Sequence, residues 1–233
     1  MSDHAELLTI IVPVYNEVAT SRAVVDRLLA VDLPLPREIV VVDDGSTDGT
    51  AQVLDAAVGE RLPIAVLHAG RNGGKGAAIR LGLRHARGSI VAIQDADLEL
   101  DPQQLADLVA PILRGTADVV YGSRFLGGRA GAPLVTFVAN RILTGATNLL
   151  FGASLTDMET CYKVMRTSVA RSLDLSADRF DIEPQITARL LRRGHRIHER
   201  PVRFEARSRA EGKKIGWRDG VRALRVLVSE RVR

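Results

Sequence analysis

Five short apolar runs, rich in β-branched residues, constrain the fold of this chain more than any other feature of its sequence. They cover residues 7–14, 38–43, 63–68, 89–94 and 117–121. A strand that is apolar at almost every position is buried on both faces, as in a parallel sheet covered by helices. Segments with apolar residues at helical spacing separate the runs. This alternation predicts βαβ units with right-handed crossovers, and hence an α/β fold with one mostly parallel, doubly wound sheet.

Polar or glycine-rich residues close four of the five runs, at the edge of the sheet where ligands bind in folds of this kind. Glu17 and Asp44 follow the first two runs, and carboxylates suit ribose hydroxyls and base N–H donors. Lys75 stands in a glycine-rich turn at residues 70–76, where its ammonium group suits phosphates. These positions together predict a nucleotide site.

The glycine-rich turn does not match either of two common nucleotide-binding motifs. A phosphate-binding loop needs glycine at position 69 and serine or threonine at position 76, where this chain has Ala69 and Gly76. A dinucleotide fingerprint should follow the first strand, but residues 13–17, PVYNE, contain no glycine. A phosphate-loop nucleotidase and a dehydrogenase are therefore disfavoured.

Three carboxylates two residues apart, Asp95, Asp97 and Glu99, follow the fourth run. On a strand, side chains at this spacing project to one side, where acids repel each other unless a cation lies between them. Oxygen ligands without nearby histidine or cysteine point to Mg²⁺ or Mn²⁺. The alternative is a helix start capped by Asp97 or Asp101 ahead of Pro102, which leaves Asp95 unexplained. We expect a metal or diphosphate site.

Length and cysteine usage indicate one domain in a reducing compartment. The 233 residues suit a single large α/β domain, because no linker or low-complexity segment divides them. The single cysteine, Cys161, excludes an internal disulfide, so we expect a cytoplasmic protein. No uninterrupted apolar run reaches about 18 residues, and neither a membrane span nor a signal peptide is expected.

Basic residues gather toward the C-terminus. After residue 185 the chain has 15 Lys/Arg against 5 Asp/Glu, within a formal net charge of +4. A basic segment beside an acidic body indicates a partner with phosphates, or else a solvated surface. We do not expect a nucleic acid partner, because the basic residues lack interleaved aromatics and the acidic strand ends would repel phosphates without a metal.

Five motifs, taken in order, resemble the family 2 glycosyltransferases, which have a GT-A nucleotide-sugar fold. They are PVYNE at 13–17, VDDGSTDGT at 42–50, NGGKGAA at 72–78, DAD at 95–97 and GSR at 122–124. The resemblance covers residues 7 to about 205 of this sequence. It implies a sugar transferase that uses a nucleotide sugar.

Three further stretches are similar to the polyprenyl-phosphate, or dolichyl-phosphate, mannosyl- and glucosyltransferase branch: YGSRF, TDMETCYKVMR and FDIEPQI. This branch transfers mannose or glucose, with inversion, from GDP-mannose or UDP-glucose to a lipid phosphate, and uses Mg²⁺ or Mn²⁺. The resemblance therefore implies the same donor classes, a dolichyl or undecaprenyl phosphate acceptor, and peripheral contact with the cytoplasmic face of a membrane or with a separate membrane protein.

The resemblance also assigns roles at the strand ends. It places four residues around the nucleoside: Pro13, Tyr15, Glu17 and Asp44. Asp95 and Asp97 are implied to hold ribose, diphosphate and metal. Glu99 stands where this branch often has glutamine, which adds a negative charge to the expected metal site. Residues 207–216 resemble a loop that closes over the donor, in which Lys213 could reach the diphosphate.

Arg124 and Arg141 occupy the matched positions that we expect to bind the acceptor phosphate. A phosphate monoester is already anionic near neutral pH, so it needs cationic positioning more than a base. A hydroxyl acceptor, soluble or polysaccharide, would instead need a general base, for which Asp157 is the candidate. A third role for Asp157 is to cap the next helix.

We divide the chain into a GT-A catalytic domain, residues 1–206, and a basic loop with an amphipathic helix, residues 207–233. One face of that helix, which would pack on the body or on a membrane, carries an apolar stripe of Trp217, Val221, Leu224 and Val228. Residues 134–155 are too polar to span a bilayer and rather apolar for a soluble surface helix, so lipid contact, core packing and a dimer interface all fit. A non-catalytic sugar-nucleotide-binding or membrane-docking subunit is the alternative from another class.

Overall fold

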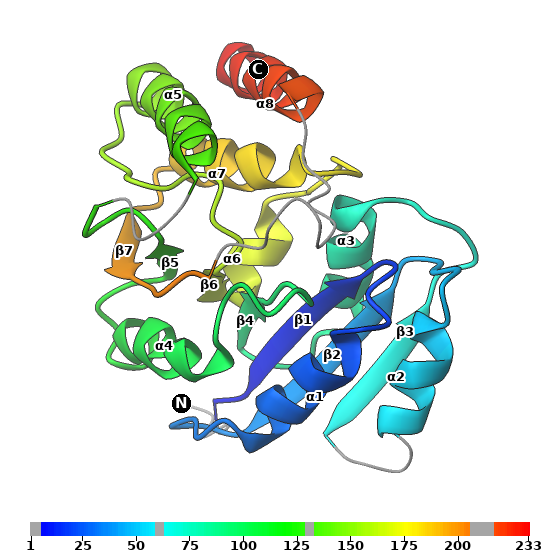
Figure 1. The fold of residues 1–233 in the computed structure, drawn as a ribbon. Coiled ribbons are helices and arrows are strands. Elements are labelled where there is room, and N and C mark those ends of the chain that lie inside the picture. Colours follow the sequence, from blue (N-terminus) through cyan, green and yellow to red (C-terminus); the bar gives the residue numbers. More distant parts are fainter. Residues whose placement is uncertain (1–5, 59–62, 129–132, 206–216) are drawn as a thin grey trace.

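A seven-stranded sheet forms the centre of the protein (Figure 1). The computed structural model describes residues 6–58, 63–128, 133–205 and 217–233. Along the sheet the strands run in the order β3-β2-β1-β4-β6-β5-β7. Their bounds are β1 Leu8–Val14, β2 Arg37–Asp43, β3 Ile64–His68, β4 Ile90–Ile93, β5 Val119–Ser123, β6 Lys163–Arg166 and β7 Ile197–Pro201.

The α/β fold with a mostly parallel sheet is confirmed, with one exception in strand direction. β1 pairs in parallel with β2 and β4, β2 with β3, and β5 with β7. β6 runs antiparallel between β4 and β5, so the fourth and fifth predicted strands are not neighbours. β6 was not predicted, because it has only four residues and begins and ends on the charged residues Lys163 and Arg166.

Two layers of helices bury the faces of the sheet. One apolar cluster joins it to α1, α2 and α4, and another joins the opposite face to α3, α6 and α7. The helices are α1 Ser21–Ala30, α2 Thr50–Val58, α3 Lys75–His85, α4 Leu105–Leu113, α5 Leu134–Phe151, α6 Thr167–Ser172, α7 Ile182–Arg192 and α8 Trp217–Val232, with a short 3₁₀ helix at Pro102–Gln104.

α5 and α8 form an outer layer that packs on α7, away from the sheet (Figure 1). Leu143 of α5, Ala188 of α7 and Leu227 of α8 meet in one apolar cluster. Glu230 of α8 is buried and pairs with Arg189 of α7 at 2.7 Å. α7 is therefore enclosed between the sheet and the outer layer, which explains why residues 182–190 are all buried.

The outer faces of α5 and α8 are apolar and exposed. α8 docks through Ala223, Leu227 and Glu230, so the stripe formed by Val221, Leu224 and Val228 faces outward. The face through which α8 packs on the body is therefore not the apolar stripe that the sequence indicates.

α5 is long and apolar enough to cross a membrane by length and composition, with a mean hydropathy of 1.3 and 22% of its residues buried. This corrects the sequence argument that the segment is too polar to span. Its buried side nevertheless carries Asn140, Thr144 and Thr147, which hydrogen-bond within the protein. α5 is therefore held here by polar contacts to the body.

Candidate active site

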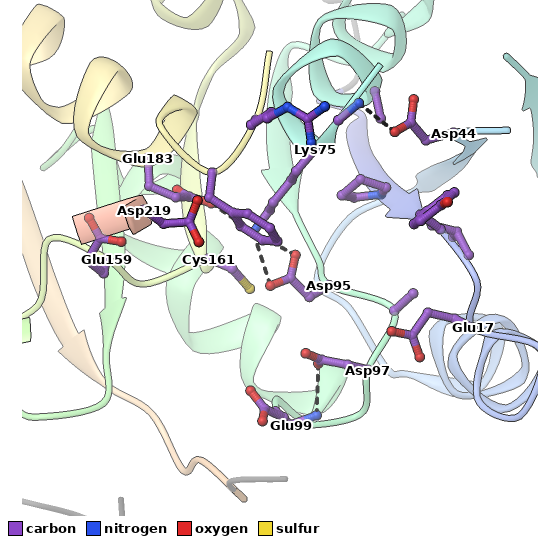
Figure 2. Close-up of a pocket in the computed structure, with 18 of the residues that line it drawn as sticks. Glu17, Asp44, Lys75, Asp95, Asp97, Glu99, Glu159, Cys161, Glu183 and Asp219 are labelled. Atoms are coloured by element: carbon purple, nitrogen blue, oxygen red, sulfur yellow. Dashed lines mark hydrogen bonds and ion pairs between the residues drawn. The ribbon is translucent and has the colours of Figure 1, made fainter. Parts of the chain in front are cut away.

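The strand ends that the sequence predicted to meet do line one cavity of about 420 Å³ (Figure 2). Nine of the predicted site residues contribute to its wall: Pro13, Tyr15, Glu17, Asp44, Lys75, Asp95, Asp97, Glu99 and Arg124. Arg141 is exposed on α5 and does not line this cavity, and Asp157 lies buried behind Arg124. Lys213 lies outside the described residues.

The glycine-rich turn binds a carboxylate instead of presenting its amides to a phosphate. The N–H groups of Gly73 and Gly74 donate to the two oxygens of Asp44 at 2.9 and 2.7 Å. Gly74 has φ 99°, and a Cβ there would lie 2.5 Å from the carbonyl oxygen of Asp178, so only glycine fits this approach. Burial raises the pKa of Asp44, although these two amides act in the opposite direction. The carboxylate is fixed at the cavity wall with lone pairs left to accept from a ligand.

Glu17 lies next to this carboxylate end of the cavity, in the turn between β1 and α1. Its backbone N–H donates to Thr50 Oγ1 at 2.9 Å, and its Oε2 accepts from Thr20 Oγ1 at 3.0 Å. Thr20 is the N-cap residue of α1, so Glu17 precedes the helix and is not part of its first turn. Glu17 is therefore not a first-turn acid stabilised by the dipole of α1.

Lys75 is the centre of a buried chain of charges. As the first residue of α3, it extends its ammonium group to within 2.8 Å of both Asp95 Oδ1 and Glu183 Oε1. Glu183 Oε2 in turn binds the ammonium group of Lys163, which is fully buried. Burial alone would lower the pKa of Lys75, but Asp95 and Glu183 raise it, so the ammonium stays charged.

The three carboxylates after β4 do not converge as the strand argument predicted. β4 ends at Ile93, so they lie in an irregular turn and the alternation of side chains along a strand does not apply to them. Asp95 faces Lys75, while Asp97 Oδ1 accepts a hydrogen bond from the backbone N–H of Glu99 at 3.1 Å (Figure 2). The described part of the chain contains no group of three His, Cys, Asp or Glu side chains placed to hold a metal ion.

Asp101 has the helix-capping role proposed as the alternative for this segment. Its carboxylate accepts from the N–H of Gln103 at 3.1 Å, and Pro102 follows it at the first position of the 3₁₀ helix. Asp97 does not cap that helix and lines the cavity instead.

Asp157 holds Arg124 in place. Its oxygens accept from the backbone N–H, Nε and Nη2 of Arg124 at 2.9, 2.7 and 2.8 Å, and from Asn140 Nδ2 at 2.6 Å. The carboxylate is 0% exposed, so this geometry does not suit a general base. The Arg124 guanidinium also lies 5.3 Å from the ring centres of Phe125 and Phe204. Arg124 itself lines the cavity.

Several residues of the cavity were not found from the sequence. Glu183 and Glu159 line it, as do Asp219 and Arg222 from the start of α8. The sequence signal for Glu183 was its place inside the motif FDIEPQI. An acid in the first turn of a helix is common and does not by itself indicate a functional site. Burial raises the pKa of the Cys161 thiol, in keeping with a small buried residue and not a nucleophile.

Comparisons with known proteins identify the family of the chain. Residues 9–173 match the family described as "Glycosyl transferase family 2". An undecaprenyl-phosphate mannosyltransferase from Micrococcus luteus is 32% identical, over 88% of this chain and 86% of the relative. A dodecaprenyl-phosphate galacturonate synthase from Rhizobium johnstonii is 29% identical, over 88% of this chain and 61% of the relative. The chain thus spans nearly all of one relative and about three-fifths of the other.

Solved structures share the fold. Glucosyl-3-phosphoglycerate synthase from Mycobacterium tuberculosis in complex with UDP superposes with a TM-score of 0.75, over 97% of this chain and 80% of that one, at 21% identity. The same enzyme with Mn²⁺, UDP-glucose and phosphoglyceric acid gives a TM-score of 0.71 at 22% identity. These likenesses confirm the GT-A architecture. With the family match over most of its length, the chain belongs to glycosyl transferase family 2.

Proposed function

We propose that this protein transfers mannose or glucose, with inversion, from GDP-mannose or UDP-glucose to a polyprenyl phosphate of the dolichyl or undecaprenyl type. The layout of the cavity carries the proposal. The carboxylates suited to a nucleoside, Glu17 and Asp44, lie on one side, the Lys75 ammonium group pairs with Asp95 in the middle, and the Arg124 guanidinium lines the same cavity (Figure 2). Similarity to two polyprenyl-phosphate sugar transferases supports the acceptor class.

The donor end is served by residues of the strand ends. Pro13, Tyr15, Glu17 and Asp44 would surround the nucleoside, with the two acids accepting from ribose hydroxyls or base N–H groups. Lys75 would bind the diphosphate, because its charge is maintained by Asp95 and Glu183. Lys213, outside the described residues, is proposed as a second cation for the same diphosphate.

A divalent metal fits this donor set. Mg²⁺ is usually held by one or two carboxylates together with substrate phosphates, and not by a complete protein cage. Asp97 would be the principal ligand, with Asp95 and Glu99 as candidates for a second. When bound, Mg²⁺ or Mn²⁺ would neutralise charge on the departing diphosphate as a Lewis acid.

The acceptor end is served by Arg124. Held by Asp157 and lying 5.3 Å from the ring centres of Phe125 and Phe204, its guanidinium would hold a phosphate monoester against the anomeric carbon. A phosphate oxygen forms the new bond to that carbon as the bond to the diphosphate breaks, and the electron pair leaves with the nucleoside diphosphate. An anionic phosphate needs no general base. This agrees with the structure, in which the Asp157 carboxylate accepts hydrogen bonds from Arg124 and Asn140. Arg141, on the exposed side of α5, could meet a phosphate only outside the cavity.

Thermal-shift measurements test the donor class. UDP or GDP, or one of their sugars, with Mn²⁺ is expected to raise the Tm by about 5–10 °C at a hundredfold excess over its Kd. Removing Mn²⁺ with a chelator should reduce this shift, and ADP serves as the control nucleotide. Stabilisation by neither UDP nor GDP would contradict the proposal. Transfer of labelled sugar to undecaprenyl phosphate then separates an enzyme from a non-catalytic sugar-nucleotide-binding subunit.

The exposed apolar faces of α5 and α8 support a peripheral site at the cytoplasmic face of a membrane, where a lipid acceptor would be met. These faces are formed by Leu134, Val135, Val138, Ile142 and Leu149 of α5 and by Val221, Leu224, Val228 and Val232 of α8. Arg141, Arg225 and Arg231 are exposed on the same two helices and suit anionic headgroups. A separate membrane protein or a second copy of the chain would use the same apolar surface.

Leu149→Glu is expected to weaken binding to vesicles of phosphatidylcholine and phosphatidylglycerol by about tenfold or more, because Leu149 is 86% exposed and its burial in lipid would be lost. Co-sedimentation measures this binding. Val18→Glu is the matched control, since Val18 is also exposed but lies between β1 and α1. The membrane role would be contradicted if the wild-type protein does not bind vesicles but dimerises through these faces, as measured by ultracentrifugation.

A further inference from the structure

The end of the cavity that would receive the donor sugar is set by the layout of its charged residues. In Figure 2, Glu17 and Asp44 lie on one side, Asp95 and Asp97 in the middle, and Glu159 and Glu183 on the other side. In a nucleotide sugar the hexose is attached to the distal phosphate. If the proposed function holds and the nucleoside lies at Asp44, the hexose therefore lies on the side of Glu159.

Most acids near that end are already committed to partners. Glu183 binds Lys75 with one oxygen and Lys163 with the other. Asp157 accepts hydrogen bonds from Arg124 and Asn140. Each of these carboxylates therefore has a structural assignment that explains its presence.

Glu159 differs from them. Its side chain lines the cavity, yet its Oε1 is shielded from solvent and has no hydrogen-bond partner within the described ranges of the chain. A buried acceptor left unpaired costs free energy, so native proteins rarely keep one without a reason. An oxygen of this kind at the wall of a binding cavity is satisfied when a ligand brings a donor to it.

We propose that Glu159 determines sugar specificity, with its carboxylate accepting a hydrogen bond from a hydroxyl group of the transferred hexose. The assignment rests on the proposed function for the identity of the ligand, and on the unpaired Oε1 for the choice of residue. Sites that hydrogen-bond a substrate hydroxyl discriminate strongly against analogues without it, because the buried partner is then left unpaired.

The electrostatic surroundings of Glu159 add a pH dependence. Burial and the neighbouring Glu183 raise the pKa of Glu159 to about 7, with Asp157 acting in the same direction, while Lys163 and Arg124 lower it. A sugar hydroxyl donates to the ionised carboxylate. Donor affinity should therefore be highest above pH 7 and fall as the pH drops below it, in the wild type but not in Glu159→Gln.

Calorimetric titration separates sugar contacts from nucleotide contacts. The probes are UDP, UDP-glucose and UDP-galactose, and GDP with GDP-mannose, each with Mn²⁺ at pH 8. Glu159→Ala is expected to weaken binding of the preferred nucleotide sugar by about 10–100-fold, the range for a hydrogen bond to a charged group. Binding of the matching nucleoside diphosphate should change by less than about twofold. Asp107→Asn removes one charge from the exposed side of α4 and is the control.

The position of the hydroxyl follows from deoxy analogues of the preferred donor. The analogue without the recognised hydroxyl should bind the wild type as weakly as the full donor binds Glu159→Ala, and Glu159→Ala should bind both equally. If Glu159→Ala loses turnover but binds the donor normally, Glu159 acts on the acceptor side and the assignment is overturned. Equal weakening of the sugar nucleotide and the nucleoside diphosphate also overturns it.

Stability measurements test whether Glu159 has a structural role instead of a role in sugar binding. A carboxyl whose folded pKa lies above its unfolded value costs stability once the pH exceeds the unfolded value, so Glu159→Gln should raise the Tm at pH 8 and match the wild type near pH 4. A lower Tm for Glu159→Gln at pH 8 would show that Glu159 holds the fold, and would overturn the assignment. Failure of the wild type to bind any of these probes would instead refute the proposed function, and the assignment with it.

Discussion

Glu183→Ala is expected to lower the free energy of unfolding by about 3–5 kcal/mol, the usual cost of removing one partner from a buried ion pair. Glu183 is 3% exposed and its two oxygens separate the ammonium groups of Lys75 and Lys163. Without it, Lys163 would keep a fully buried charge that contacts two backbone carbonyls and the Tyr121 ring, with the Glu159 carboxyl group nearby. Urea unfolding followed by circular dichroism measures the loss.

The surface pair between Arg22 and Asp26 is the control, because both side chains are about half exposed and Arg22→Ala should change stability by less than about 1 kcal/mol. The double variant Lys163→Met, Glu183→Leu removes both charges and should recover part of the loss. Equal destabilisation by Arg22→Ala and Glu183→Ala would contradict the buried-pair argument.

The pH dependence of stability gives an independent check on Glu183. Burial raises its pKa, but Lys163 and Lys75 more than compensate, so the folded pKa lies below the usual value. A carboxyl with a lowered folded pKa contributes stability above its unfolded pKa of about 4.3, and this contribution is lost as the pH falls through the folded pKa. The stability difference between the wild type and Glu183→Ala should therefore shrink below about pH 4.

The parallel half of the sheet was predictable because its strands are buried on both faces. β1 and β2 are apolar at almost every position, and a fully buried strand requires that pattern whatever lies around it. The same rule placed Glu17, Asp44 and Asp95 at one edge, since parallel strands end together. The cavity could be assembled from the sequence for this reason.

Contacts between residues far apart in the chain could not be predicted in the same way. Lys163 and Glu183 form a buried ion pair, and no local sequence pattern around either residue predicts it. Asp95 was expected beside a metal, and its ion pair with Lys75, which precedes it by 20 residues, was not predicted. The face through which α8 packs on the body could not be predicted either. Periodicity locates an apolar stripe on the helix, but it does not show that Ala223 and Leu227 form the buried face instead.

Asp97→Asn is expected to reduce the rate of sugar transfer by about 10²–10³-fold, the usual effect of removing one group that stabilises charge in a transition state. Asp97 lines the middle of the cavity in Figure 2, and it is the carboxylate proposed to hold the metal against the diphosphate. Asparagine keeps an oxygen at the same place but loses the negative charge that attracts a dication. The variant should also need a higher Mn²⁺ concentration for half-maximal activity.

Asp101→Asn provides a control from the same turn. Asp101 caps the 3₁₀ helix by accepting from the N–H of Gln103, and asparagine caps helices about as well as aspartate. The two variants therefore lose the same charge within four positions of each other, but only Asp97→Asn removes it from the proposed metal site. Near-normal transfer by Asp97→Asn, or an equal loss in both variants, would mean that general negative charge in this turn matters and that Asp97 has no direct part in handling the diphosphate.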